Sequence, residues 1–471
     1  MVFSSLEFIF IFMPAFLFIY FLMPFRFRNL ILFIGSLIFY SVGTLEHPLY
    51  ILLIVMSVLV NYLLALGISR TKFKKLLLIS GLIYNLGWLF VFKYSDFLFS
   101  GVNQALDAFF PQTGFRFGML GLLLPVGISF YTFQSISYIA DVYKGTCTAE
   151  KSFINLGAYI CMFPQLIAGP IVAYSSIREQ LRTERRFSSE ALSGGIKTFI
   201  FGLGLKVIIA NQLGNLWTTL STIGYESISA PLAWMGLFAY SFQLYFDFFG
   251  YSLMAIGLGQ IIGFDLPENF RHPYMSLSMT EFWRRWHITL GSWFREYVYI
   301  PLGGSRKGKP RLIFNLLAVW LLTGLWHGAS LNFVLWGFVL FVFITIEKLW
   351  LKNILDRHKW LGHLYMLVLI PLSWALFAIT DFSQLATFFG RLFPFFSSAP
   401  SVIYRYDYIK YAKEFGVLLL VSLIFSTTLP YRLINRYKNT IFETVFLLAV
   451  FYFAVYCMYK GLNDPFLYFR F

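Results

Sequence analysis

The sequence predicts an all-α polytopic membrane protein, and three observations support this fold class. Of the 471 residues, 58% are hydrophobic and 13% are charged, whereas a soluble domain has about 25% charged residues. The mean hydropathy is +0.70, and the apolar residues form runs near the ~20 residues that a helix needs to cross a bilayer. The aromatic content of 21% suits lipid-facing surfaces and interfacial belts.

The apolar runs predict about 11 to 13 transmembrane or re-entrant helices. They cover residues 6–24, 30–42, 49–66, 76–92, 119–139, 156–172, 198–213, 232–262, 312–326, 331–346, 361–379, 416–429 and 441–459. Gly and Pro interrupt the segment 152–173, which we expect to be re-entrant, since broken helices are tolerated where they are buried in protein. We expect residues 1–471 to form a single membrane domain, with 263–311 as its largest cytoplasmic insertion.

Charge and cysteine content exclude several classes of protein. The net charge of +15 collects in loops, which indicates membrane topology and attraction to anionic headgroups. No basic soluble face with interleaved aromatics is present, so nucleic-acid binding is not expected. The three cysteines lack CxxC spacing and neighbouring histidines, so neither a metal site nor a disulfide framework is expected.

One ionisable side chain stands out between the apolar runs. His327 lies in the stretch 325–328, Leu-Trp-His-Gly, between the apolar segments 312–322 and 333–344. An ionisable group at membrane depth is costly unless it faces a cavity or a partner, so it is by default a candidate functional residue. The alternative is that His327 satisfies a neighbouring carbonyl and only packs.

A second histidine, His287, lies in the polar insertion 263–311. The stretch 278–281, Ser-Met-Thr-Glu, is a capping box, which predicts a helix beginning near Thr280. One continuous helix would place four residues on one face: Trp283, Trp286, His287 and Leu290. We expect this helix to lie in the cytoplasmic interface with its histidine turned inward.

The residues by themselves leave two functions open. A neutral histidine can act as general base for a hydroxyl that attacks a thioester. Arg284, Arg285 and Arg295 are candidates for binding the phosphates of a donor such as coenzyme A, with ordinary anchoring at the membrane interface as the alternative. A pair of histidines fits equally well a proton relay in a transporter of an acylated or lipid-linked intermediate.

A set of motifs points further. The segment 282–304 contains Phe-Trp-Arg-Arg-Trp-His-Ile-Thr-Leu and then Tyr-Ile-Pro-Leu-Gly-Gly. Three further motifs lie upstream, at 124–134, 163–170 and 240–252, and a fourth surrounds His327 at 325–328. This pattern resembles the signature of membrane-bound O-acyltransferases, and it is most similar to the alginate O-acetylation branch. The motif core spans 124–337, and the runs on both sides agree with the layout of that family.

The resemblance implies a fold of tilted helices around a central tunnel through the membrane. It implies that His327 is the catalytic histidine and that His287 is the second motif residue. It also implies that a short acyl group, with acetyl-coenzyme A as the suspected donor, passes from the cytoplasm to an acceptor outside. The implied partners are a secreted or membrane-anchored esterase-like acyltransferase and an extracellular polysaccharide. The implied location is the bacterial cytoplasmic membrane, which the chain crosses many times.

Two positions depart from the alginate branch. That branch usually has a small polar residue after Phe248 and an acidic residue after Ser252, where this chain has Phe249 and Leu253. The acceptor is therefore open to other envelope polymers. D-alanyl transfer to teichoic acid from a carrier protein is the nearest alternative. The transporter is less favoured because no two matching halves with broken helices are found.

Several further residues are candidates for lining the tunnel, with packing or interhelical hydrogen bonding as the alternative role. They are Asp247, Gln134, Gln165, Gln243, Asn315, Trp283 and Trp326. Lys206 lies within an apolar run, and we expect its side chain to extend to a membrane interface.

Overall fold

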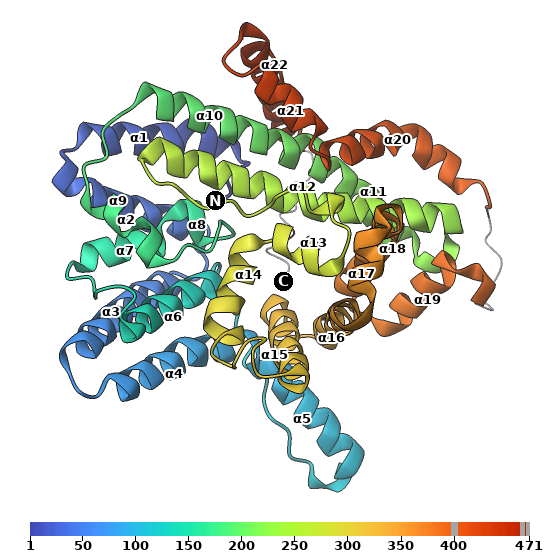
Figure 1. Ribbon diagram of the computed structural model, residues 1–471, viewed down its shortest axis with the longest axis horizontal. Helices are drawn as coiled ribbons and strands as arrows, with labels where there is room; N and C mark the ends of the chain where they lie inside the picture. Colours follow the sequence, from blue (N-terminus) through green and yellow to red (C-terminus); the bar gives the residue numbers. More distant parts are fainter. Residues whose placement is uncertain (397–403, 462–466, 468–471) are drawn as a thin grey trace. The chain divides into compact units, whose positions relative to one another are not determined.

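The computed structural model is built from helices in the part of the chain that it describes, residues 1–396, 404–461 and 467 (Figure 1). Within those residues the β-structure is limited to one isolated antiparallel bridge between Phe270 and Trp286. The all-α expectation is therefore confirmed. The chain forms two compact units: Met1–Leu192 with Gly259–Leu266 and Gly328–Ser330, and Ser193–Leu258 with Pro267–His327 and Leu331–Phe471.

The first unit contains the elements from the N-terminus to α9 and the first turn of α10. Its helices are η1 (Phe8–Phe12), α1 (Met13–Leu22), α2 (Phe25–Val42), α3 (Leu49–Arg70), α4 (Lys74–Lys93), α5 (Ser95–Phe109), η2 (Pro111–Thr113), α6 (Ile128–Lys144), α7 (Phe153–Cys161), α8 (Phe163–Leu166) and α9 (Tyr174–Arg182).

The second unit contains the helices that hold both histidines. A continuous helix of three parts comes first: α10 (Ser189–Gly204), η3 (Leu205–Ala210) and α11 (Asn211–Ile223). The short helix η4 (Tyr225–Ser227) and the long helix α12 (Ala230–Ile262) follow it. The polar insertion and the next hairpin are η5 (Pro273–Met275), α13 (Met279–Arg285), α14 (Ile288–Phe294), η6 (Arg295–Tyr299), α15 (Lys309–His327), α16 (Leu331–Ile346) and η7 (Glu347–Leu351). The last elements are α17 (Lys352–Arg357), α18 (Lys359–Ala378), α19 (Phe382–Leu392), η8 (Pro394–Phe396), α20 (Asp407–Phe425), α21 (Leu429–Arg436) and α22 (Ile441–Tyr459).

Eight helices among the described residues are long and apolar enough to cross a membrane, or nine if α20 and α21, bent by 72°, are counted as one span. A multi-pass membrane protein is thus confirmed. The expected total of 11 to 13 also included short or re-entrant segments. One of these, 152–173, forms the short helices α7 and α8, and neither reaches the ~20 residues that a span needs.

The expected span 119–139 is wrong in its first half. Helix α6 begins only at Ile128, and residues 118–125 form an irregular segment before it. Gly127 takes a φ of +75°, and a Cβ at this position would overlap the carbonyl oxygen of Leu166. Only glycine satisfies both conditions, so the helix starts after it.

A buried carboxylate organises one loop of the first unit. Glu150 accepts hydrogen bonds from the hydroxyl of Tyr174, from Arg182 at 2.9 Å, and from the N–H groups of Lys151 and Ser152 at 2.8 and 2.9 Å. Burial alone would raise the pKa of Glu150, but these hydrogen bonds together hold it below its ordinary value. The loop between α6 and α7 is therefore fixed by an ionised side chain.

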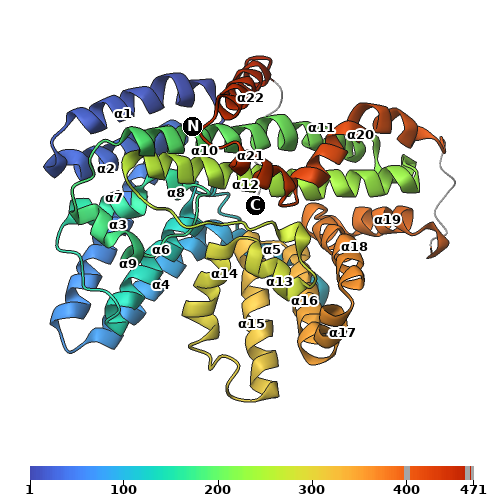
Figure 2. The same ribbon diagram turned by 45° about the horizontal axis from the view of Figure 1, so that its top comes forward.

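The expectation that the side chain of Lys206 extends to a membrane interface is wrong. Its side chain is 0% exposed, and Nζ lies 2.7 Å from Oδ1 of Asp247 and donates to Oδ1 of Asn211 at 2.8 Å. Figure 2 shows α10 and α11 running alongside α12. Glycines allow this approach, since a Cβ on Gly202 or Gly250 would meet the backbone of the facing helix. The pairing of these helices therefore buries Lys206 against an acid distant in sequence.

Candidate functional site

The helix that the capping box predicts begins as expected. The hydroxyl of Ser278 accepts a hydrogen bond from the N–H of Glu281 at 3.1 Å, and α13 follows. This helix ends at Arg285, however, and α14 starts only after His287, which has a φ of +46°. The single continuous helix through this region is therefore wrong.

A short backbone pairing explains the break. The N–H of Arg271 donates to the carbonyl of Arg285, and the N–H of Ile288 donates to the carbonyl of Asn269, both at 2.9 Å. These bonds flank the isolated bridge and tie the loop before η5 to the end of α13. A left-handed backbone at a non-glycine residue costs about 1–3 kcal/mol and persists only where its surroundings enforce it. The pairing enforces it at His287.

His287 is buried, with 2% of its surface exposed. Its ring meets Phe248 edge-on, with ring centroids 4.7 Å apart, and lies 5.9 Å from the ring of Trp326. The Nδ1 atom lies 3.1 Å from Oδ1 of Asn269. Burial lowers the pKa of His287 to about 3, so the imidazole is neutral at physiological pH.

His327 is the last residue of α15 and is half-buried in an aromatic cluster. Its ring lies 4.9 Å from Trp326, 5.2 Å from Trp336 and 5.1 Å from Phe377, in each case close to perpendicular. Trp326 therefore contacts both His327 and His287. The structure thus brings together two histidines that are forty positions apart in the sequence.

Two glycines set the position of His327. A Cβ on Gly324 of α15 would overlap the carbonyl oxygen of Phe333, and one on Gly337 of α16 would overlap that of Trp320. The two helices are in backbone contact at these points. Because His327 lies three residues after Gly324, the close crossing fixes the histidine relative to α16.

Trp283 connects the histidine cluster to a second region. Its ring lies 5.5 Å from Trp336, which contacts His327, and 5.2 Å from Trp320 of α15. Trp283 and Trp320 also line a cavity of about 900 Å³. One wall of that cavity thus reaches, through Trp283 and Trp336, to the ring of His327.

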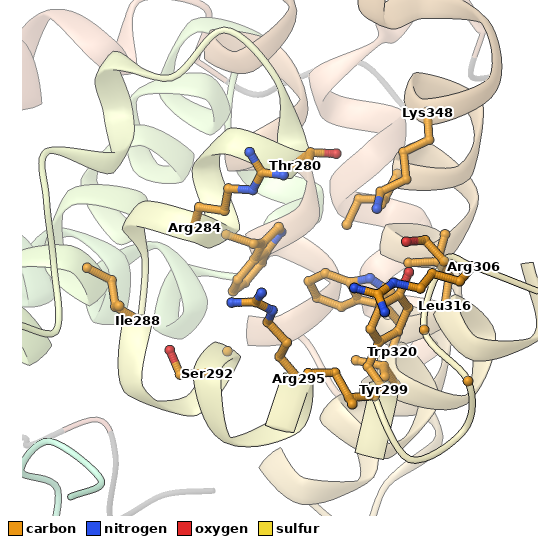
Figure 3. A pocket seen from close by; sticks show the side chains of 18 residues that line it. Thr280, Arg284, Ile288, Ser292, Arg295, Tyr299, Arg306, Leu316, Trp320 and Lys348 are labelled. Atoms are coloured by element: carbon orange, nitrogen blue, oxygen red, sulfur yellow. The ribbon is translucent and has the colours of Figure 1, made fainter. Parts of the chain in front are cut away.

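The cavity is strongly basic. Figure 3 shows the side chains of Arg284, Arg295, Arg306 and Lys348 around one space, and these four cations come from separate elements. The lining residues include no acid. Of the three arginines singled out from the sequence, Arg284 and Arg295 line the cavity. Arg285 does not line the cavity and instead pairs with Glu281 at 2.5 Å. Arg306 and Lys348 also line it, although the sequence analysis does not single them out.

Hydrogen bonds hold the walls of this cavity in place. Nδ2 of Asn315 donates to the carbonyl of Gly304 at 2.9 Å, which ties the glycine-rich loop to α15. The carboxylate of Glu347 accepts from the N–H of Met279 at 2.5 Å and from the N–H and hydroxyl of Thr280 at 2.9 Å. Asn315 therefore does not line the cavity itself but holds Gly304, which does.

The remaining candidates have other surroundings. Asp247 forms the ion pair with Lys206, and Gln243 packs over Gly214 of α11. Gln134 and Gln165 are buried in the first unit rather than in the unit that holds the histidines. In the described part of the chain no group of three or more His, Cys, Asp or Glu side chains suits a metal ion.

Comparison with known proteins identifies the family of this chain. Residues 149–380 match the model of the membrane-bound O-acyltransferase family. The chain is 38% identical over 400 residues to "Probable alginate O-acetylase AlgI" of Pseudomonas putida, covering 84% of this chain and 81% of the relative. It is 34% identical over 418 residues to the peptidoglycan O-acetyltransferase of Helicobacter pylori, covering 80% and 77%.

A more distant relative is the teichoic acid D-alanyltransferase of Bacillus subtilis, 31% identical over 251 residues that cover 50% of this chain and 62% of the relative. The chain belongs to the membrane-bound O-acyltransferase family. It is a multi-pass membrane O-acyltransferase. Of the two functions that the residues left open, the comparisons therefore support acyl transfer rather than transport.

Proposed function

We propose that this enzyme transfers an acetyl group from acetyl-coenzyme A in the cytoplasm to an envelope polysaccharide outside the bacterial cytoplasmic membrane, or to a secreted esterase-like partner that acts on it. One observation carries the proposal. His287 and His327 share Trp326 as a neighbour, and Trp283 and Trp336 connect His327 to the basic cavity. One buried and one half-buried imidazole beside a basic cavity suit acyl transfer from a thioester whose carrier bears phosphates.

The cavity suits the donor by charge. Coenzyme A carries several phosphate charges, and Arg284, Arg295, Arg306 and Lys348 would hold them through charge-assisted hydrogen bonds. The absence of an acid among the lining residues adds to the attraction. The indole of Trp320 offers an apolar wall beside these cations. The thioester supplies the activated acyl carbon.

The reaction needs one proton transfer. His327 would take the proton from the acceptor hydroxyl as that oxygen attacks the thioester carbonyl. The new C–O bond forms an ester, the C–S bond breaks, and the proton finally passes to the leaving thiolate. His287 would line the approach of the thioester, next to Trp326. In this division of roles His327 accepts the proton of the acceptor hydroxyl, and His287 contacts the acyl donor.

The acceptor is an envelope polymer with free hydroxyl groups. The relatives' names include alginate, peptidoglycan and teichoic acid, and Phe249 and Leu253 replace the polar and acidic residues usual in the alginate branch. We propose that 263–311 faces the cytoplasm, because this basic stretch follows the Lys/Arg rule for orientation. The donor would then meet the cavity from the cytoplasmic side.

A donor comparison tests the proposal. Purified enzyme is given either [14C]acetyl-coenzyme A or a D-alanyl thioester on a carrier protein, and the release of free thiol and the fate of the label are followed. Consumption of acetyl-coenzyme A alone supports the proposal. Consumption of the carrier-bound thioester alone would overturn the assigned donor and favour D-alanyl transfer, as in the Bacillus subtilis relative.

A further inference from the structure

Three donors converge on one oxygen atom beside the buried histidine. Oδ1 of Asn269 lies 3.1 Å from Nδ1 of His287, 3.2 Å from the N–H nitrogen of Thr289 and 2.9 Å from the hydroxyl of Thr289. A backbone N–H can only donate, so the atom of the Asn269 amide that faces it must be the oxygen. The orientation of this amide is therefore fixed by its hydrogen-bond partners.

The orientation of the Asn269 amide determines the tautomer of His287. Because Oδ1 of Asn269 can only accept, Nδ1 of His287 must carry the hydrogen. The ring is neutral in its buried position, so Nε2 is left with a lone pair and no proton. Nε2 has no hydrogen-bond partner within the described part of the chain. A buried acceptor without a partner is costly, so Nε2 is available to a donor group on a bound substrate.

We propose that Asn269 is a positioning residue that holds His287 as the Nδ1–H tautomer, so that Nε2 accepts a hydrogen bond from an O–H or N–H group of the bound substrate. The proposal deepens the role of His287 and rests on the proposed acyl transfer. It also excludes one role for His287. A neutral ring in this tautomer cannot donate from Nε2 to the carbonyl oxygen of the thioester, so it cannot stabilise the oxyanion.

The backbone of Asn269 supports the same arrangement. Its carbonyl accepts the N–H of Ile288 at 2.9 Å, and this bond helps to hold the left-handed backbone of His287. One residue therefore sets both the backbone position and the ring tautomer. In the well-studied serine protease triad a buried acid plays the corresponding part toward its histidine, and a change that leaves the wrong tautomer lowers turnover by about 10⁴-fold.

The first test reads the tautomer without needing activity. The enzyme contains six histidines, so 15N-histidine labelling with solid-state NMR in lipid, and the His287→Gln variant for assignment, identifies the ring signals of His287. We expect a protonated Nδ1 and an unprotonated Nε2 in the wild type. A protonated Nε2 would overturn the proposal, whatever the enzyme's activity.

The second test is kinetic. Asn269→Leu keeps the size but removes the acceptor, so the turnover should fall about 10²-fold or more, with a smaller change in KM. Asn269→Asp keeps the acceptor and adds a negative charge that favours His287⁺. This variant should be active at high pH. As the medium is acidified, its activity should disappear at a higher pH than the activity of the wild type. A purely structural role for Asn269 would not move the pH profile.

The matched control is Asn85→Leu. Asn85 is equally buried and pairs with Asn61 between α3 and α4, in the first unit. Its variant should lose stability but keep the pH profile and the His287 tautomer. An unchanged pH profile in active Asn269→Asp would overturn the positioning role. If instead the wild type shows the expected tautomer but transfers no acyl group, the proposed function fails while the geometry of His287 stands.

Discussion

Replacing Lys206 by Met removes one half of a buried ion pair and leaves the carboxylate of Asp247 without its cation. The two charged atoms lie 2.7 Å apart, and their side chains are 0% and 3% exposed. Losing one partner of a pair this deeply buried costs about 3–5 kcal/mol. Asp247→Leu should cost a similar amount, since it leaves the buried ammonium of Lys206 without this carboxylate.

The double variant Lys206→Met/Asp247→Leu should be far less damaging than the two single variants together. The double variant removes both charges of the pair, and it still loses the hydrogen bonds to Oδ1 of Asn211 and from the N–H of Leu467, at about 1 kcal/mol apiece. We therefore expect a destabilisation of about 2 kcal/mol, against about 6–10 kcal/mol for the simple sum.

The assay is unfolding of the four proteins in mild detergent, followed by tryptophan fluorescence. Lys197 and Glu443 supply the control cycle, because their pair is 2.5 Å long but 26% and 7% exposed, and we expect a smaller coupling of about 1 kcal/mol. Additive losses in the Lys206 and Asp247 cycle would refute the reasoning, since they would mean that the two charges do not stabilise each other.

Three further predictions concern the site and the first unit. Gly337→Val should separate α15 from α16, cost about 1–3 kcal/mol and lower acyl transfer, whereas Gly416→Val, where a Cβ meets nothing, should do neither when unfolding and transfer are measured. Arg295→Gln should raise the KM for acetyl-coenzyme A about tenfold by losing a charge-assisted contact, and Arg271→Gln, which lies outside the cavity, should leave it unchanged in the same titration. Because the pKa of Glu150 is lowered in the folded protein, the ionised side chain stabilises the fold fully above pH 4.5, its ordinary pKa, and this stabilisation is lost as the pH falls through the folded pKa. Glu150→Gln should therefore be less stable at neutral pH, and its stability should fall less steeply as the pH is lowered. A stability curve equal to that of the wild type would contradict this.

Local chemistry made part of the site predictable. His327 and His287 stand out because an ionisable group among apolar runs needs a partner or a purpose. Ser278 signals the start of α13 because its hydroxyl and the residue three positions on form a recognisable cap. The match between guanidinium and phosphate geometry singles out Arg295 in the sequence, and Arg295 lines the basic cavity. In each case the signal is contained in a few neighbouring residues.

The rest depends on contacts between distant segments. The break at His287 arises from pairing with Asn269 and Arg271, which no helical periodicity reveals. Lys206 looks like an interfacial lysine until α12 brings Asp247 beside it. Lys348 joins the cavity from η7, far along the chain from Arg284. Tertiary packing decides these positions, so sequence patterns of one segment do not contain them.

The catalytic assignment of His327 is tested most directly by release of free thiol from [14C]acetyl-coenzyme A by purified enzyme, with wild type beside His327→Ala. His358→Ala is the matched control, since His358 is exposed between α17 and α18. We predict that label transfer disappears in folded His327→Ala and persists in His358→Ala. Transfer at the wild-type rate by His327→Ala would contradict the assignment.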